Sequence, residues 1–151
     1  MKRILAAVAA GFLATGAWAG ADDIVRVKAE GDVDKVMDAL ELAVEGAGAT
    51  VFARVDHATG AEEAGMYIAP SQVLIFGNPK IGTLAMQDDP LAGLYLPMKV
   101  LVYRDGDGQV WLAYEEPGEM LDDAEGISDD AEYLGQMREA LEALTAKAAK
   151  G

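Results

Sequence analysis

The spacing of hydrophobic and polar residues changes several times along the chain, and each spacing predicts a different secondary-structure element. Residues 24–28 partly alternate apolar with polar side chains, as a half-buried strand does. Residues 33–45 instead carry apolar side chains three and four apart, which predicts an amphipathic helix with Asp32 as its N-cap. A β-branched second strand is expected over 50–55, and an alanine- and glutamate-rich short helix over 56–64.

The middle of the chain carries an apolar run without alternation. Residues 72–76 contain four consecutive large apolar side chains, which predicts an inner strand covered on both faces. Gly77 then turns the chain into a short helix expected over 80–87. Asn78 is suited to cap that helix and Pro79 to occupy its first position.

The second half of the chain predicts a hairpin and a closing helix. Residues 98–103 and 109–114 flank two aspartate-glycine pairs, a strong signal for adjacent antiparallel strands. An acidic turn and loop is expected over 119–130, followed by a helix over 129–149. The sequence therefore predicts one α+β domain, with helices packed on a mixed or antiparallel sheet, in the order β-α-β-α-β-α-β-β-α.

The first residues have the pattern of a secretory leader. Two basic residues precede an apolar run over 4–14, and the small residues Ala17 and Ala19 follow at the two positions that a signal peptidase requires to be small. This run is shorter than the roughly 20 residues that a membrane-spanning helix needs. We expect a signal peptide over 1–19, with cleavage after Ala21 as the alternative, and a single mature domain over 22–150. The expected location is periplasmic or secreted, with no stable membrane anchor.

The composition limits the partners of the mature protein. The chain has 12 basic and 26 acidic residues and a formal charge of −14. The leader contains two basic and no acidic residues, so its removal leaves a more acidic protein. Such a protein repels the phosphate backbones of nucleic acids, which we exclude as partners. The chain contains no cysteine, which excludes disulfides, thiolate nucleophiles and thiolate metal sites.

Residues 48–117 resemble a known family of small bacterial domains. The segments that carry the likeness are Thr50-Val51-Phe52-Ala53-Arg54-Val55-Asp56-His57, Leu74-Ile75-Phe76-Gly77-Asn78-Pro79-Lys80-Ile81-Gly82-Thr83 with Met86, Leu96-Pro97-Met98-Lys99-Val100-Leu101-Val102-Tyr103, and Val110-Trp111. In them the chain is similar to the DUF302 family, whose function is unknown. The resemblance implies an α+β fold in which helices pack on a sheet, and assembly as a homodimer. It implies no catalytic mechanism.

The turn after the apolar strand is the leading candidate for a binding site. Its residues link a strand to a helix start, where free backbone amides attract anions. The diagnostic lysine and hydroxyl of a nucleotide-binding loop are missing, because Thr83 and Leu84 stand in their places. A purely structural turn is the competing interpretation. The candidate ligand-binding residues are His57, Phe76, Gly77, Asn78, Lys80, Gly82 and Thr83.

His57 is the single histidine and follows Asp56 directly. An aspartate-oriented imidazole can act as a base or ligate haem or copper, with Met86 as a soft second ligand. A histidine that only braces a helix start is the simpler interpretation, so we predict no metal and no cofactor. His57 is expected near Asn78, on the assumption that the strands before the two residues are neighbours.

These observations lead to two hypotheses of function. The first is a non-enzymatic exported module that binds a small anionic or apolar ligand near the Asn78 turn. The alternative is an enzyme, or a redox, haem or metal accessory protein, that uses Asp56 and His57. Whether the chain is an enzyme stays open, and the absence of a catalytic motif argues against it. Asn78 is expected to matter more than His57 for ligand binding.

Overall fold

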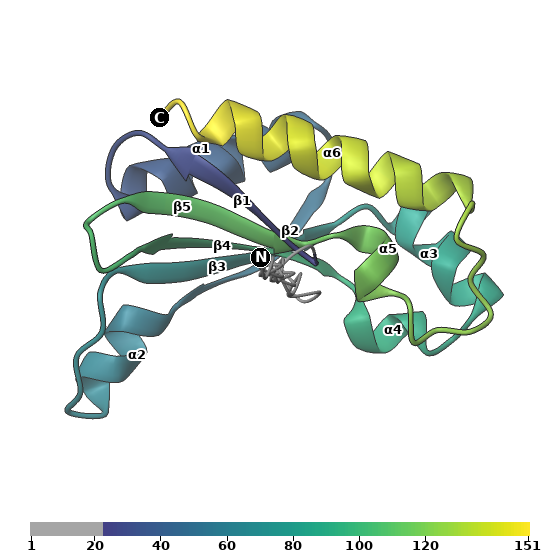
Figure 1. Cartoon of the computed structure of the whole chain (residues 1–151), viewed down its shortest axis with the longest axis horizontal. Coiled ribbons are helices and arrows are strands. Elements are labelled where there is room, and N and C mark those ends of the chain that lie inside the picture. Colours follow the sequence, from purple (N-terminus) through teal and green to yellow (C-terminus); the bar gives the residue numbers. More distant parts are fainter. Residues whose placement is uncertain (1–22) are drawn as a thin grey trace, which may run out of the picture.

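The computed structural model describes residues 23–151, and the predicted leader with both cleavage positions lies outside them. The described chain forms a sheet with helices against it (Figure 1). The strands are β1 (Ile24–Ala29), β2 (Thr50–Asp56), β3 (Ser71–Gly77), β4 (Met98–Arg104) and β5 (Val110–Glu115). The helices are α1 (Val33–Gly46), α2 (His57–Glu63), α3 (Pro79–Asp88), α4 (Ala92–Tyr95), α5 (Pro117–Met120) and α6 (Glu132–Ala148).

The five strands pair in the order β1-β5-β4-β3-β2, and every neighbouring pair is antiparallel. This confirms the predicted α+β class and specifies the sheet as antiparallel throughout. The predicted β4–β5 hairpin is also confirmed, since Leu101 pairs with Ala113 and Arg104 with Val110. The helices α4 and α5 are additions to the expected order. Each is one turn of four residues, too short to produce a hydrophobic period.

Helices α1 and α6 lie over the same face of the sheet and bury it (Figure 1). Their apolar stripes meet the inward side chains of the strands, which alternate along β3 and β4. Fully buried large residues in this layer include Phe76, Met37, Leu40, Leu74, Leu112, Met137 and Leu141. Burying one such side chain contributes about 1.5–3 kcal/mol, so this single layer supplies most of the hydrophobic stabilisation.

The opposite face of the sheet carries no packed helix layer in residues 23–151, and this corrects the prediction for β3. Along β3 buried residues alternate with half-buried ones, so only one face is fully covered. The apolar run in the sequence of β3 is unbroken because the side chains on its second face, Val73 and Ile75, are also apolar. The residues Val55, Val73, Leu101 and Ala113 stand opposite one another across four strands. We call this row and its neighbours the open face.

Strand β2 contains a register shift between Val51 and Ala53. Val51 pairs with Phe76 and Ala53 with Ile75, so Phe52 is the additional residue of a β-bulge. The bulge changes which side chains point to each face. Arg54 therefore points toward α1, where its Nη1 donates to Asp38 Oδ1 over 2.6 Å, and Phe52 remains 55% exposed.

Candidate functional site: an apolar groove at the Asn78 turn

The turn from β3 into α3 has the predicted cap. Asn78 is extended, with φ −114° and ψ 112°, and its Oδ1 accepts a hydrogen bond from the backbone N–H of Lys80 over 3.0 Å. Pro79 occupies the first helical turn, where its missing N–H costs no hydrogen bond. A side-chain oxygen at this position satisfies a donor that the helix itself cannot.

The same contacts remove the basis for an anion at this helix start. Pro79 has no N–H, Lys80 donates to the Asn78 side chain, and Ile81 and Gly82 both donate to the Asn78 carbonyl oxygen, over 3.0 and 2.9 Å. The amides expected to be free are therefore already used. The Lys80 side chain is exposed and does not line the cavity beside the turn.

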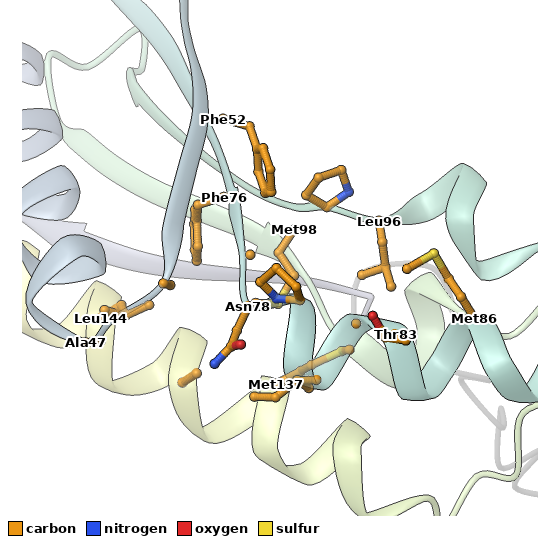
Figure 2. Close-up of a pocket in the computed structure, with 17 residues that line it drawn as sticks. Ala47, Phe52, Phe76, Asn78, Thr83, Met86, Leu96, Met98, Met137 and Leu144 are labelled. Carbon is orange, nitrogen blue, oxygen red and sulfur yellow. The ribbon is translucent and has the colours of Figure 1, made fainter.

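An apolar groove of about 400 Å³ lies beside this turn (Figure 2). It is bounded by the end of α1, by β2 and β3, by α3, by the start of β4 and by α6. Its lining consists of Ala47, Ala49, Phe52, Phe76, Gly77, Asn78, Pro79, Ile81, Gly82, Thr83, Met86, Leu96, Pro97, Met98, Met137, Ala140 and Leu144. Elements from both ends of the chain thus meet around the predicted loop.

The groove has a buried floor and an exposed rim. Phe76 is fully buried, Met137 is 2% exposed and Met98 is 8% exposed, so these side chains form a fixed floor. Phe52 and Met86 are 55% and 39% exposed and stand at the rim. Flexible, polarisable methionine side chains adapt to ligands of different outline. The lining therefore combines a rigid base with an adaptable edge.

Only two lining residues carry polar side chains, Asn78 and Thr83, and none is ionisable. Transfer of a charged group from water into such surroundings is costly unless a partner neutralises it. The groove therefore suits an uncharged, largely apolar molecule. Of the two ligand classes expected from the sequence, the apolar one matches this lining.

Gly77 and Gly82 contribute to the groove by lacking a side chain, and neither is needed for a left-handed backbone conformation. Neither has a positive φ. A methyl group at Gly82 would stand 3.6 Å from Leu96 Cδ1, and one at Gly77 would stand 3.6 Å from Pro97 Cβ. These are ordinary contact distances, so a methyl group at either position fits while occupying groove volume.

His57 lies at the opposite end of the β2–β3 pair, contrary to the expectation. The strands are neighbours, as assumed, but they run antiparallel. Thr50 pairs with Gly77 at the groove end, while Asp56 pairs with Gln72 at the other. Seven residues of strand separate the two ends by roughly 20 Å. His57 is thus absent from the groove lining, which does contain Met86.

The carboxylate of Asp56 is used for structure. Its Oδ1 accepts from the backbone N–H of Thr59 over 3.0 Å and thereby caps α2. This bond lowers the Asp56 pKa below its usual 3.8. Asp56 Oδ2 also accepts from Gln72 Nε2 over 3.4 Å. No hydrogen bond between Asp56 and the His57 ring occurs in residues 23–151, nor does a cluster of three or more histidine or acidic residues suited to a metal.

Two further contacts hold the helical side of the groove. The Tyr133 hydroxyl at the start of α6 donates to Asp88 Oδ2 at the end of α3 over 2.8 Å. Burial, together with this bond, raises the pKa of Tyr133 to about 12. The Tyr95 hydroxyl donates to Asp123 Oδ2 over 3.0 Å and connects α4 to the acidic loop. Part of the acidic segment over 119–130 therefore holds α4, which directly precedes the groove residue Leu96.

The sequence prediction missed the distant walls of the groove. Phe52 appeared only as part of the family likeness, and Met137 and Leu144 only within the predicted helix over 129–149. Their shared position depends on tertiary packing. One sequence signal was available for all three. Each is an apolar residue, Phe52 in a predicted strand and the other two in a helix predicted to pack on the sheet.

Comparison with known proteins agrees with this architecture. The family model for the domain of unknown function DUF302 matches residues 25–144. The chain belongs to the DUF302 family. The crystal structure of an uncharacterized conserved DUF302 protein from Bacillus stearothermophilus is similar with a TM-score of 0.76, over 85% of this chain and 99% of that one. At 19% identity, this likeness shows the fold alone.

This DUF302 domain also resembles part of two curated proteins. The fluoride-specific ion channel FluC 1 of Brucella suis biovar 1 (strain 1330) is 40% identical over 94 residues, which are 62% of this chain and 37% of that protein. FluC 2 of Brucella melitensis biotype 1 is also 40% identical over 94 residues, 35% of its length. The chain thus spans about a third of the length of these relatives. Within residues 23–151, no helix has the length and apolar character needed to cross a membrane.

Proposed function

We propose that this DUF302 domain is a non-enzymatic binding module that holds a small apolar ligand in the groove at the Asn78 turn. The observation that carries the proposal is a cavity of about 400 Å³ whose lining has no ionisable side chain. Sites for small molecules have volumes of about 300–1,000 Å³, predominantly apolar walls and a few placed polar groups. The groove has each of these properties.

The competing function, catalysis or metal chemistry at Asp56 and His57, has less support. The Asp56 carboxylate is occupied by the cap of α2, and the helix that begins with His57 has no buried residue. A reactive imidazole needs an orienting partner and a cleft that receives the substrate. The geometry around His57 supplies neither in the described residues.

A titration with the neutral fluorescent probe N-phenyl-1-naphthylamine tests the proposal. We expect saturable binding of one probe per groove, weakened at least about tenfold by Phe52→Asp, since a carboxylate then enters the apolar wall. Phe52 is largely exposed, so this variant should remain folded. His57→Ala is the matched control and should bind like the wild type. Equal binding by Phe52→Asp, or loss of binding in His57→Ala, contradicts the proposal.

We further propose that the module acts outside the cytoplasm, after removal of its leader. The support is the order of basic, apolar and small residues before position 22. Mass analysis of the mature N-terminus should find Gly20 or, for the alternative cleavage, Asp22. An intact Met1 on material purified from the cell envelope contradicts the proposal.

We also propose that two copies pair through the open face. Val73 and Leu101 lie in a half-buried apolar row across the sheet, and large apolar surface of this kind commonly marks an interface. Helix α2 stands beyond this face and buries none of its residues within one chain (Figure 1). The loop after it adds Met66 and Tyr67, which are 65% and 81% exposed. A second copy would cover both surfaces.

Sedimentation analysis distinguishes pairing from a monomeric state. The wild type should have twice the mass of one chain at micromolar concentration, more completely at higher salt because each copy is strongly negative. Val73→Glu on the open face should give the mass of one chain. The control Leu42→Glu changes a residue of α1 that is 68% exposed on the helix side, and should leave the mass unchanged. A monomeric wild type contradicts pairing.

A further inference from the structure

The Asn78 side chain has a fixed orientation that leaves a donor free beside the groove. A backbone N–H can only be accepted by the amide oxygen, so its bond with Lys80 assigns Oδ1 to the helix start. The two N–H groups of Nδ2 must then point elsewhere. Among the hydrogen bonds of residues 23–151, none is made by Asn78 Nδ2.

Apolar side chains line the groove near this donor, which reaches solvent in the free protein. Figure 2 shows the Asn78 side chain extending toward α6, with the amide nitrogen beyond the oxygen. The groove residues on that side include Ala47, Met137 and Leu144, none of which has a side chain that accepts a hydrogen bond. Asn78 is itself half-buried. When a ligand fills the groove and displaces water, this donor needs an acceptor from the ligand, because a buried unpaired donor is costly.

The walls indicate the shape of the ligand. Four ring side chains contribute to the lining, those of Phe52, Phe76, Pro79 and Pro97. The aromatic rings of Phe52 and Phe76 pack well against other aromatic ring systems. The volume lies near the lower end of the range for small-molecule sites. A compact molecule of fused rings matches both the size and the surface.

We infer that the ligand is a neutral, flat, apolar molecule with one hydrogen-bond acceptor, such as a carbonyl oxygen, that receives an N–H from Asn78 Nδ2. This inference rests on the proposed function, because it names the class of molecule for the same groove. The second polar side chain, Thr83, is exposed, so water satisfies its hydroxyl without a ligand. Asn78 is therefore the residue that selects for the acceptor.

Three probes of matched shape separate the possibilities. 2-Acetylnaphthalene carries a carbonyl acceptor, 2-ethylnaphthalene has no acceptor, and 2-naphthoate carries a negative charge. Each is titrated against the wild type and against Asn78→Ser, which still caps a helix but has no amide N–H. Thermal unfolding of both proteins verifies that the variant is folded.

The diagnostic quantity is the ratio of the dissociation constants for the ethyl and acetyl probes. We divide this ratio for the wild type by the same ratio for Asn78→Ser. The two probes differ in hydration, but that difference is the same for both proteins and cancels in the quotient. We expect this quotient to be about ten, the factor that one hydrogen bond commonly gives. The side-chain NH₂ resonances of Asn78 should also shift when the acetyl probe binds and stay in place with the ethyl probe.

Each other outcome has a definite meaning. A quotient near one, with both neutral probes bound, overturns the acceptor inference while leaving the apolar binding module intact. Failure of both neutral probes to bind overturns the proposed function itself. Tighter binding of 2-naphthoate than of 2-acetylnaphthalene overturns the assignment of a neutral ligand.

Discussion

Two turns at opposite ends of the β2–β3 pair are built by the same local rule and have different consequences. Asp56 ends β2 and accepts from the backbone N–H of Thr59 over 3.0 Å. Asn78 follows β3 and accepts from the backbone N–H of Lys80 over 3.0 Å. In both, a short polar side chain on an extended residue starts a helix. Locally, the two turns are equivalent candidates for a site.

The difference lies in what each helix meets. Helix α3 packs against α6 and forms a wall of the apolar groove. Helix α2 has no buried residue. A capped turn therefore determines where a helix begins, but only packing between distant elements makes a cavity beside it. The comparison explains why the Asn78 turn, and not the Asp56 turn, is the candidate site.

Filling the space beside each turn should produce the largest contrast. The Cβ of Gly82→Leu points toward Leu96 in the groove, whereas a Cβ at Gly60 in α2 meets nothing within 4 Å, which is why Gly60→Leu is the control. We expect the first variant to weaken binding of N-phenyl-1-naphthylamine at least about tenfold and the second to leave it unchanged. Both replace a helical glycine, so both should gain helix propensity. Equal loss of binding in the two variants would mean that the probe binds outside the groove.

Removing the side-chain caps at Asn78 and Asp56 should affect different quantities, the global free energy of unfolding for Asn78 and the local opening of α2 for Asp56. Asn78→Ala should lower the free energy of unfolding by about 1 kcal/mol, because α3 belongs to the packed structure. Asp56→Ala should change global unfolding much less, because α2 opens without disturbing a core. Urea denaturation measures the first effect, and hydrogen exchange of the α2 amides measures the second. Equal global effects would show that α2 is better integrated than its exposure indicates.

Removing the hydrogen bond between Tyr133 of α6 and Asp88 of α3 should have a smaller effect on the free energy of unfolding, with a distinct pH dependence. Tyr133→Phe removes the bond to Asp88 and should cost about 0.5–1.5 kcal/mol. Tyr67→Phe, at an 81% exposed position after α2, is the control and should cost nothing measurable. The folded-state pKa of Tyr133 is about 12, against about 10 for an unfolded tyrosine.

The unfolded chain therefore loses its tyrosine proton first as pH rises, so the contribution of Tyr133 to stability declines above pH 10. The wild type should lose stability between pH 10 and 12 more steeply than Tyr133→Phe. Denaturant curves at a series of pH values measure this slope. Parallel curves for the two proteins would contradict the role of the hydroxyl.

Of the two compared turns, only the Asp56 turn should respond to acid, and this is the smallest expected change. The Asp56 pKa is lowered in the folded state by the backbone N–H of Thr59. Its contribution is thus present above the unfolded value and is lost as pH falls through the folded one. Amide NMR signals of α2 should show fraying below pH 3.8, while the neutral Asn78 keeps α3 capped. Simultaneous fraying of both helix starts would instead indicate general acid unfolding.

The sequence was informative where structure is determined locally. The caps at Asp32 and Asn78 and the hairpin at the aspartate-glycine pairs depend on neighbouring residues, and the structure confirms them. The expected proximity of His57 to Asn78 was wrong because a strand sequence does not state its direction relative to its neighbour. The interpretation of β3 as covered on both faces was wrong for a related reason, since apolar character does not identify what covers it.

The bulge in β2 leaves one residue, Phe52, outside the strand pairing that holds the rest of the sheet. Phe52 has no partner in the β3 ladder, whereas Val51 and Ala53 on either side are paired with Phe76 and Ile75. A change at position 52 therefore alters the rim of the groove without altering the register that positions the core. If the groove binds a ligand as proposed, its selectivity can change through this residue while the fold is preserved.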